Sequence, residues 1–376
     1  MLDLQKMRND IDEIDTRIVK LFEERMKICE NVAQFKIETG KPVFDKSREQ
    51  EKLDSLGGKA HNDFNRCGVQ ELFQQIMSIS RKRQYQLLQE NGMEEKSDFV
   101  KIDGLKKQNA TVVFQGVEGA YSFAAMHTFF GAEIKSFSVD TWKDAMEAIR
   151  MEKADFAVLP IENSTAGIVQ DIYDLLTEYD HVIVGEQIIP CEHVLMGLPG
   201  TSLSHIHTVY SHPQALMQCR EFLEKHRDWQ QMEWNNTAAA AKKVADEKNP
   251  AQAAIASRYA AEHFGLAVLE EGIYSNVNNS TRFIIVTREK IFCRDACKIS
   301  VSYELPHESG SLYSSLSHFI YNGLDMTKIG SRPIMERNWE YRFFVDFEGN
   351  LSDSAVKNAL RGLKSEARNL RVHGNY

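Results

Sequence analysis

The sequence has few of the features that mark secreted, membrane or metal-binding proteins. No apolar run approaches the roughly 20 residues that a membrane-spanning helix needs, and the first residues lack the basic-then-apolar pattern of a signal peptide. The six cysteines are scattered, and the closest two, Cys293 and Cys297, have no histidine between them. We therefore expect free thiols in a cytoplasmic protein with no metal site and no membrane association.

Positive charge is also in short supply. The 54 acidic residues outnumber the 45 lysines and arginines, which gives a net charge of −9. This balance argues against a nucleic-acid partner. Hydrophobic residues make up 43% and charged residues 26% of the chain, as in an ordinary globular protein, and 376 residues are too many for one core. We therefore expect two or three domains.

The strongest periodic pattern lies at the N-terminus. Apolar residues recur three and four positions apart over residues 4–39, which predicts one long helix that Gly40 and Pro42 end. Such a helix spans roughly 50 Å, more than a small domain can cover, so its apolar face is expected to pack against a second copy of the chain. Two further helices are predicted, one opened by a capping box at Ser47–Gln50 and one over residues 66–90.

A charged residue interrupts this apolar face. Arg25 stands where the pattern expects an apolar side chain, and Lys36, eleven residues later, returns to within about 20° of the same direction. Arg8 points away from both, so it would share their pocket only if a partner chain donated it. A buried cation is costly unless it is paired or binds a ligand. For Arg25, a stem that covers apolar surface or a paired glutamate is the alternative to a ligand contact.

Residues 1–90 resemble the all-helical chorismate mutase family. The matching residues, which the resemblance implies are substrate ligands, are Arg8, Arg25, Lys36, Asp45, Arg48, Glu49, Ser80 and Gln84. The family implies an intertwined three-helix homodimer in which each pocket takes an arginine from the other chain. It also implies that chorismate rearranges to prephenate without proton transfer or a covalent intermediate, so catalysis depends on positioning and charge stabilisation.

The same resemblance implies a role for each of the main catalytic residues. Arg8 and Arg25 would each bind a substrate carboxylate with two parallel hydrogen bonds. Lys36 and Gln84 would donate to the ether oxygen on which negative charge builds. Glu49 would accept a hydrogen bond from the ring hydroxyl.

Residues 91–109 are polar with weak periodicity and predict a linker, after which residues 110–288 repeat the order strand, polar turn, helix. The run Phe156–Leu159 predicts a buried strand that Pro160 ends, followed by a helix over Ile168–Leu176. Open α/β sheets bind ligands where polar groups follow a parallel strand and precede a helix. Ordinary helix capping by serine and threonine is the alternative for this turn.

Other turns in this region carry similar groups. The motifs are Gly116–Ser122, Pro160–Ser164, Ser211–Gln214 and Asn279–Phe283. Their hydroxyl, amide and backbone N–H groups suit a small polyanion held between two lobes, and the strand-like run Val182–Ile189 is expected to cross between those lobes. The first motif is not a nucleotide fingerprint, because it lacks the third glycine. A structural role is the stronger hypothesis for His212 and also for His193.

These four motifs resemble those of prephenate dehydratases. The family implies two α/β lobes, like those of periplasmic binding proteins, around a cleft in which prephenate loses its ring hydroxyl and carboxylate to give phenylpyruvate. Thr281 matches the catalytic threonine and is expected to donate a hydrogen bond to the departing oxygen. Glu162 is either a general acid, if burial raises its pKa, or an organiser of its turn. The expected substrate ligands of this domain are Glu162, Asn163, Ser164, Ser211, Gln218, Thr281 and Arg282.

Residues 297–376 predict the order βαββαβ, a sheet with helices on one face. They resemble the amino-acid-binding ACT regulatory domain, and a ligand-free accessory module is the alternative. The resemblance implies a phenylalanine site between paired domains at Gly310, Ser311, Leu312, Ser331, Arg332 and Pro333. The family usually has small or aliphatic residues at positions 311 and 313 and glutamate at 330, whereas this chain has Ser311, Tyr313 and Gly330, which leaves effector choice and inhibition strength open.

Together the resemblances imply a multidomain enzyme of phenylalanine synthesis that needs no cofactor and forms a homodimer or larger homo-oligomer. Chorismate and prephenate would be its substrates and phenylalanine its inhibitor. A non-enzymatic amino-acid sensor is one alternative. An enzyme with a single activity, or with a preference for arogenate, is another.

Overall fold

The contacts between residues divide the chain into two units. The computed structural model describes residues 3–92, 97–276, 278–334 and 337–376. The first unit contains residues 1–98 and 297–372, and the second contains residues 99–296 and 373–376. Within the described ranges, none of the helices combines the length and apolar character that crossing a bilayer requires. Part of the predicted linker, residues 93–96, lies outside the described residues.

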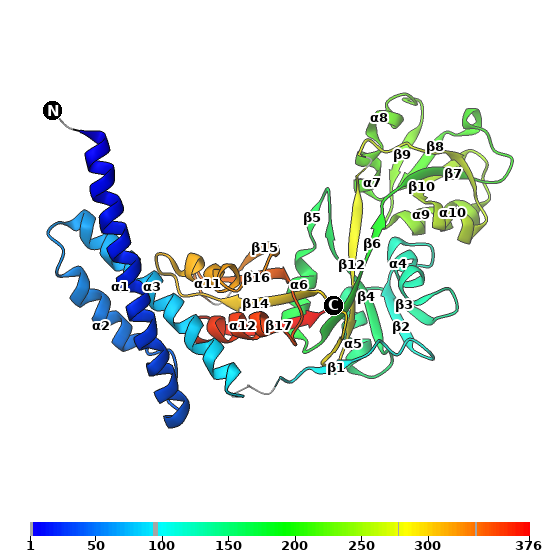
Figure 1. The fold of residues 1–376 in the computed structure, drawn as a ribbon. Coiled ribbons are helices and arrows are strands. Elements are labelled where there is room, and N and C mark those ends of the chain that lie inside the picture. Colours follow the sequence, from blue (N-terminus) through cyan, green and yellow to red (C-terminus); the bar gives the residue numbers. More distant parts are fainter. Residues whose placement is uncertain (1–2, 93–96, 277, 335–336) are drawn as a thin grey trace. The chain divides into compact units, whose positions relative to one another are not determined.

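Three helices open the first unit: α1 (Leu4–Thr39), α2 (Lys46–Gly57) and α3 (Asp63–Glu90) (Figure 1). The long first and third helices confirm the predicted periodicity. The predicted capping box at Ser47–Gln50 is wrong, because Asp45 is the N-cap of α2. Its carboxylate accepts the backbone N–H of Arg48 and also the hydroxyl of Ser47.

Apolar side chains along α1 are exposed in the single chain. They are Leu4, Met7, Ile11, Ile14, Ile18, Val19, Leu21, Ile28, Val32 and Phe35. Covering such a stripe is favourable by about 25 cal/mol for each Å² removed from water. The expected pairing of α1 with a second chain stays a prediction.

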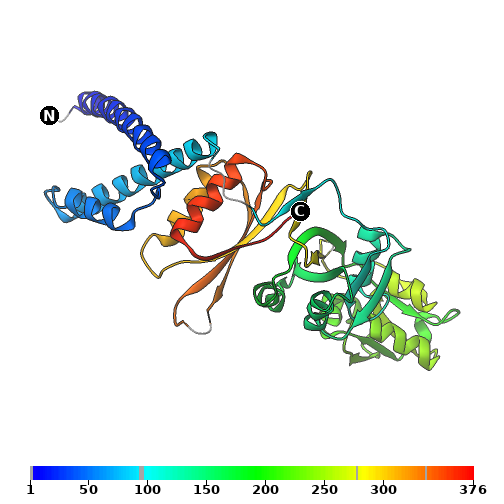
Figure 2. The same ribbon diagram turned by 90° about the horizontal axis from the view of Figure 1, so that it is seen from below.

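Residues 298–375 have the predicted βαββαβ order, and all but the last three of them belong to the first unit. The elements are β14 (Lys298–Glu304), α11 (Ser311–Ile320), β15 (Met326–Pro333), β16 (Tyr341–Glu348), α12 (Ser354–Glu366) and β17 (Arg368–Asn375). The sheet order is β15-β16-β14-β17, and α11 and α12 lie side by side on one face (Figures 1 and 2). Tyr303, Phe319, Phe347 and Val356 are buried between the sheet and these helices. The helix α12 also packs against α3.

The second unit consists of two lobes, as predicted. The first lobe contains β1 (Val100–Ile102), β2 (Thr111–Gln115), α4 (Tyr121–Phe130), β3 (Lys135–Val139), α5 (Trp142–Arg150), β4 (Phe156–Asn163), β5 (Gly167–Ile168), α6 (Gln170–Glu178), β6 (Val182–Pro190), β12 (Ser280–Thr287) and β13 (Ile291–Cys293). The second lobe contains β7 (His193–Gly197), a short 3-10 helix (Leu203–His205), β8 (Thr208–Ser211), α7 (Pro213–Gln218), α8 (Arg220–Leu223), β9 (Gln230–Glu233), α9 (Thr237–Glu247), β10 (Gln252–Ser257), α10 (Arg258–Phe264) and β11 (Ala267–Glu270).

The two lobes are built on separate sheets. The first has the order β6-β12-β4-β2-β3 and the second β11-β7-β10-β8-β9. The chain passes from one to the other between β6 and β7, where the sequence predicted a crossover. The strand β1 lies inside the predicted linker and pairs in parallel with β13.

The strand β4 is longer than predicted. It continues through Pro160 to Asn163, and α6 begins only at Gln170, so the predictions that Pro160 ends the strand and that a helix starts at Ile168 were wrong. A register shift in the β4–β12 ladder falls between Pro160 and Glu162, and such an irregularity accommodates a neighbouring residue that cannot donate a ladder hydrogen bond. Beyond the shift, Asn163 lies directly opposite Thr281.

Candidate active sites

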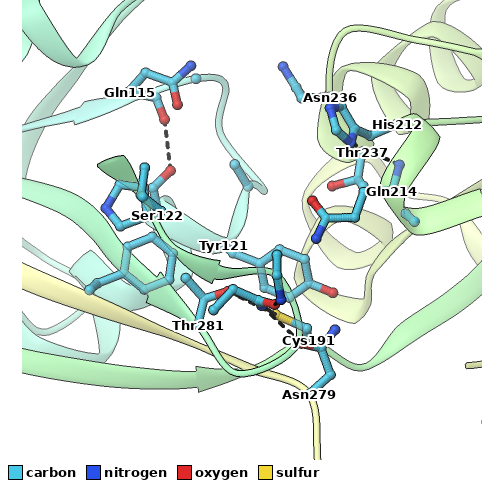
Figure 3. A pocket seen from close by; sticks show the side chains of 18 of the residues that line it. Gln115, Tyr121, Ser122, Cys191, His212, Gln214, Asn236, Thr237, Asn279 and Thr281 are labelled. Carbon is cyan, nitrogen blue, oxygen red and sulfur yellow. Dashed lines mark hydrogen bonds between the residues drawn. The ribbon is translucent and has the colours of Figure 1, made fainter. Parts of the chain in front are cut away.

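A cavity of about 450 Å³ lies in the second unit and is lined by residues of both lobes. Figure 3 shows Gln115 and Ser122 on one side of it, with His212, Gln214, Asn236 and Thr237 on the opposite side. Tyr121, Cys191, Asn279 and Thr281 lie between the two groups. The cavity therefore offers many neutral hydrogen-bonding groups to a ligand.

The hydroxyl of Thr281 is held by two neighbours. The amide nitrogen of Asn163 donates to Thr281 Oγ1 at 3.0 Å and to Asn279 Oδ1 at 2.9 Å. The sulfur of Cys191 lies 3.2 Å from the same Thr281 oxygen, and burial raises the pKa of this thiol, so it stays protonated and can donate. In the arrangement in which the thiol donates, both lone pairs of Thr281 Oγ1 are engaged, and its hydrogen is left to donate to an oxygen in the cavity.

A chain of hydrogen bonds orients Gln218. The Tyr121 hydroxyl lies 3.0 Å from His193 Nδ1, and His193 Nε2 lies 2.8 Å from Gln218 Oε1. Because an amide oxygen only accepts, Nε2 of His193 carries the proton and Nδ1 accepts from Tyr121. Burial lowers the pKa of His193, which keeps the ring neutral. The amide nitrogen of Gln218 is then turned away from His193 and can donate to a ligand.

Glu162 and Arg282 form an ion pair beside this cavity. Arg282 lies 3.4 Å from the carboxylate of Glu162 and 3.2 Å from that of Glu186, and its side chain is 13% exposed. This arrangement favours the turn-organising role of Glu162 over that of a general acid. Neither Glu162 nor Arg282 is among the residues that line the cavity.

Three other predicted residues hold the backbone around the cavity. The buried hydroxyl of Ser211 donates to the carbonyl of Ile255 at 2.6 Å, and the Ser164 hydroxyl donates to the carbonyl of Asn278 at 3.0 Å. His212 is the N-cap of α7, although its ring also lines the cavity. The structure therefore brings Asn163, Gln218 and Thr281 to the cavity and places Ser164 and Ser211 in its supporting backbone.

The first unit contains the residues predicted from the helical pattern, Arg25 and Lys36, and those predicted from the resemblance, Ser80 and Gln84. Arg25 donates to the Ser80 hydroxyl at 2.6 Å, and Lys36 donates to the carbonyl of Val43 at 2.7 Å. Gln84 is buried, and its side-chain oxygen has no hydrogen-bond partner among the described residues. Two cations on α1 and an amide on α3 whose oxygen has no partner among the described residues therefore belong to the same three-helix bundle.

Carboxylates of α2 and its N-cap complete this group. Burial lowers the pKa of Lys36, against the opposing influence of Glu49 and Asp45. Glu49 also contacts Arg81 of α3, which the sequence analysis missed because Arg81 has no distinctive spacing. Arg8 is exposed, and its distance from Arg25 along α1 is about 25 Å, so one chain cannot bring both to one pocket.

The predicted effector residues lie at one end of the C-terminal sheet. Arg342 of β16 pairs with Glu304, the last residue of β14, and with Arg332 of β15. The loop that follows β14 leads to Gly310, which has a φ of 81° and precedes α11. The segments Gly310–Leu312 and Ser331–Pro333 are thus at the same end of the sheet.

One family model matches the N-terminal helices and another matches the second unit. The model for chorismate mutase type II matches residues 7–85, and that for prephenate dehydratase matches residues 112–291. A bifunctional chorismate mutase/prephenate dehydratase of Enterobacter agglomerans is 33% identical and spans 99% of this chain and 95% of its own length. The chain belongs to this bifunctional family.

Similar proteins also include enzymes with a narrower match. An Arabidopsis thaliana protein named arogenate dehydratase/prephenate dehydratase 6 is 37% identical over 71% of this chain and 69% of its own length. A prephenate dehydratase from Arthrobacter aurescens, solved in complex with L-Phe, is 33% identical, with a TM-score of 0.65 over 71% of this chain and 89% of that chain. Each of these two matches covers 71% of this chain, and both printed names include prephenate dehydratase.

The lowered pKa of His193 predicts how the free energy of unfolding changes with pH. The unfolded chain takes up a proton on this histidine below about pH 6.5, whereas the fold resists it, so the free energy of unfolding should fall as pH drops through this range. His193→Gln should remove that part of the decline. Denaturant unfolding at pH 7.5 and pH 5.5 measures it, with the exposed His207→Gln as control. Equal pH dependence in wild type and His193→Gln would contradict the assignment.

Proposed function

We propose that the chain converts chorismate to prephenate in a pocket on α1, α2 and α3, and prephenate to phenylpyruvate in the cavity of the second unit. Its membership of the bifunctional family makes it an enzyme with chorismate mutase and prephenate dehydratase activities. The observation that carries the residue assignment is the Asn163–Thr281 hydrogen bond at the wall of the cavity. This bond holds the oxygen of Thr281, whose hydroxyl is the proposed donor to the departing hydroxyl of the substrate.

The mutase step depends on charge placed before the substrate arrives. Arg25 and the partner subunit's Arg8 each bind one carboxylate of chorismate and hold its compact conformer. Lys36 and Gln84 donate to the ether oxygen, which becomes more negative as the bond breaks. Glu49 accepts from the ring hydroxyl. The exposed stripe of α1 and the distance between Arg8 and Arg25 support a homodimer that completes each pocket.

Aromatisation of the ring drives the loss of the ring carboxylate. The dehydratase step therefore needs a hydrogen-bond donor to the departing hydroxyl more than it needs a strong acid. Thr281 donates to the departing oxygen while Asn163 and Cys191 hold its own oxygen. The amide nitrogen of Gln218, oriented through His193, donates to a substrate carboxylate. No metal or cofactor takes part in this scheme, and a cytoplasmic location belongs to the same proposal.

The C-terminal module binds phenylalanine at the end of its sheet where Gly310–Leu312 and Ser331–Pro333 lie. Two observations support this site: the register that brings both segments to one end, and the similarity to a prephenate dehydratase solved with L-Phe. Phenylpyruvate yields phenylalanine by transamination. Phenylalanine bound at this site would therefore signal that enough of this amino acid has been made.

Arogenate is a second candidate substrate for the dehydratase site. The match to an enzyme named for both arogenate and prephenate favours testing it. Arogenate has an amino group where prephenate has a keto group. The choice between these two substrates would therefore depend on the cavity residues that contact this part of the substrate.

Lys36→Ala should lower the kcat of the mutase roughly 100-fold, because a donor to the developing negative charge is lost. Arg48→Ala should instead raise KM for chorismate with a smaller change in kcat, because Arg48 is exposed and assists binding. Steady-state mutase kinetics of both variants test this, with prephenate turnover as the internal control. Near-normal kcat in Lys36→Ala would refute the assignment.

Thr281→Ala should lose dehydratase activity by about 100-fold and keep mutase activity, so that prephenate accumulates from chorismate. The removed hydroxyl is the proposed donor to the leaving group, and the helical unit is untouched. Product analysis by chromatography after chorismate addition measures both steps in one reaction. Phenylpyruvate formation at the wild-type rate would overturn the role of Thr281.

Added phenylalanine should slow phenylpyruvate formation by the wild-type enzyme. The same product assay, run with prephenate and with arogenate as starting material, measures inhibition and substrate preference together. Tyrosine at equal concentration is the matched control for the effector. Unchanged rates with phenylalanine would contradict regulation by this amino acid.

A further inference from the structure

Arg81 is a buried arginine placed between two proposed mutase residues of α3, Ser80 and Gln84. Its exposed fraction is 6%. The guanidinium contacts carboxylates from two different elements: one nitrogen meets Glu49 of α2, and another lies 2.5 Å from Glu366 at the end of α12. A charge this buried needs an opposite charge beside it, and Arg81 has two.

The second carboxylate has another basic side chain beside it. The other oxygen of Glu366 lies 3.2 Å from Nε2 of His318 on α11. Burial alone would raise the pKa of Glu366, but His318 and Arg81 outweigh it and lower the pKa, so the carboxylate is ionised at neutral pH. The guanidinium of Arg81 also lies over the ring of Phe44, 4.8 Å from its centroid. The orientation of Arg81 is therefore determined from both the mutase helices and the C-terminal module.

We propose that Arg81 is a positioning residue for the mutase reaction and that Glu366 of the C-terminal module holds it in the productive orientation. The inference rests on the proposed role of Glu49 as acceptor for the ring hydroxyl of chorismate. In the structure Arg81 meets one oxygen of Glu49, Oε2, and its other terminal nitrogen meets Glu366. The second oxygen of Glu49 stays available to substrate.

The geometry of guanidinium groups explains why Glu366 matters. An arginine with a single carboxylate partner tends to bind it through two parallel hydrogen bonds. Without the charge of Glu366, Arg81 would turn both donors toward Glu49 and occupy both of its oxygens. The substrate hydroxyl would then lose its acceptor, although the helices and their core were unchanged.

The test is Glu366→Gln in the full-length enzyme. We expect KM for chorismate to rise about tenfold with a smaller change in kcat, and prephenate turnover to stay at the wild-type level. Partial unfolding would instead lower the apparent kcat and leave KM unchanged, because it reduces the fraction of active enzyme. Glu308→Gln is the matched control, since Glu308 pairs with Lys46 of α2 at 3.8 Å but both side chains are exposed and the pair does not touch Glu49. That control should match wild type.

A double-mutant cycle shows whether Glu366 acts through Glu49. If it does, Glu49→Gln lowers mutase kcat/KM, and adding Glu366→Gln produces little further loss. An equally large effect of Glu366→Gln in the Glu49→Gln background would overturn the inference, as would unchanged mutase kinetics in Glu366→Gln alone. If Glu49→Gln itself kept wild-type kinetics, the proposed role of Glu49 would fail, which is a distinct result.

Discussion

The dehydratase site depends on the position of β12 between β4 and β6. This pairing places Thr281 opposite Asn163 on one side and opposite Ile189 on the other. The register shift beside Pro160 matters here, because a slip of one residue would turn Thr281 to the opposite face of the sheet. The hydroxyl therefore reaches the cavity through backbone pairing, with no flexible loop involved. Its neighbours Asn163 and Cys191 are positioned by the same strands and the turn after β6.

A different constraint governs the first unit, where charges are buried between helices. A charge removed from water is costly unless it meets an opposite charge or a hydrogen-bond partner. The half-buried Arg25 donates to Ser80, the half-buried Lys36 donates to a backbone carbonyl, and the buried Arg81 contacts two carboxylates. The resulting network prepares a polar pocket in advance, which suits a reaction that needs positioning and electrostatic stabilisation but no proton transfer.

Much of the architecture was predictable, because long periodic segments report their own structure. The helix α1 and the βαββαβ order followed from spacing alone. The prediction that Pro160 ends its strand was wrong because a strand can contain proline beside a register shift, and that shift depends on the partner strand. The contacts of His193 and Arg81 were not predictable for a related reason. His193 contacts Gln218 and Tyr121, and Arg81 contacts Glu366, and all of these partners are distant in sequence. A single sequence shows spacing within an element, but not which elements meet.

The packing of α3 against α12 limits how freely the parts of this chain can be separated. In α3, the consecutive residues Arg81 and Lys82 are both buried, and Lys82 donates to Ser317 of α11 at 3.2 Å. A catalytic bundle excised from this chain would expose this strip of cationic surface to solvent. The third helix is therefore an internal boundary of the first unit, and exchanging the module packed against it would require matching carboxylates in the replacement.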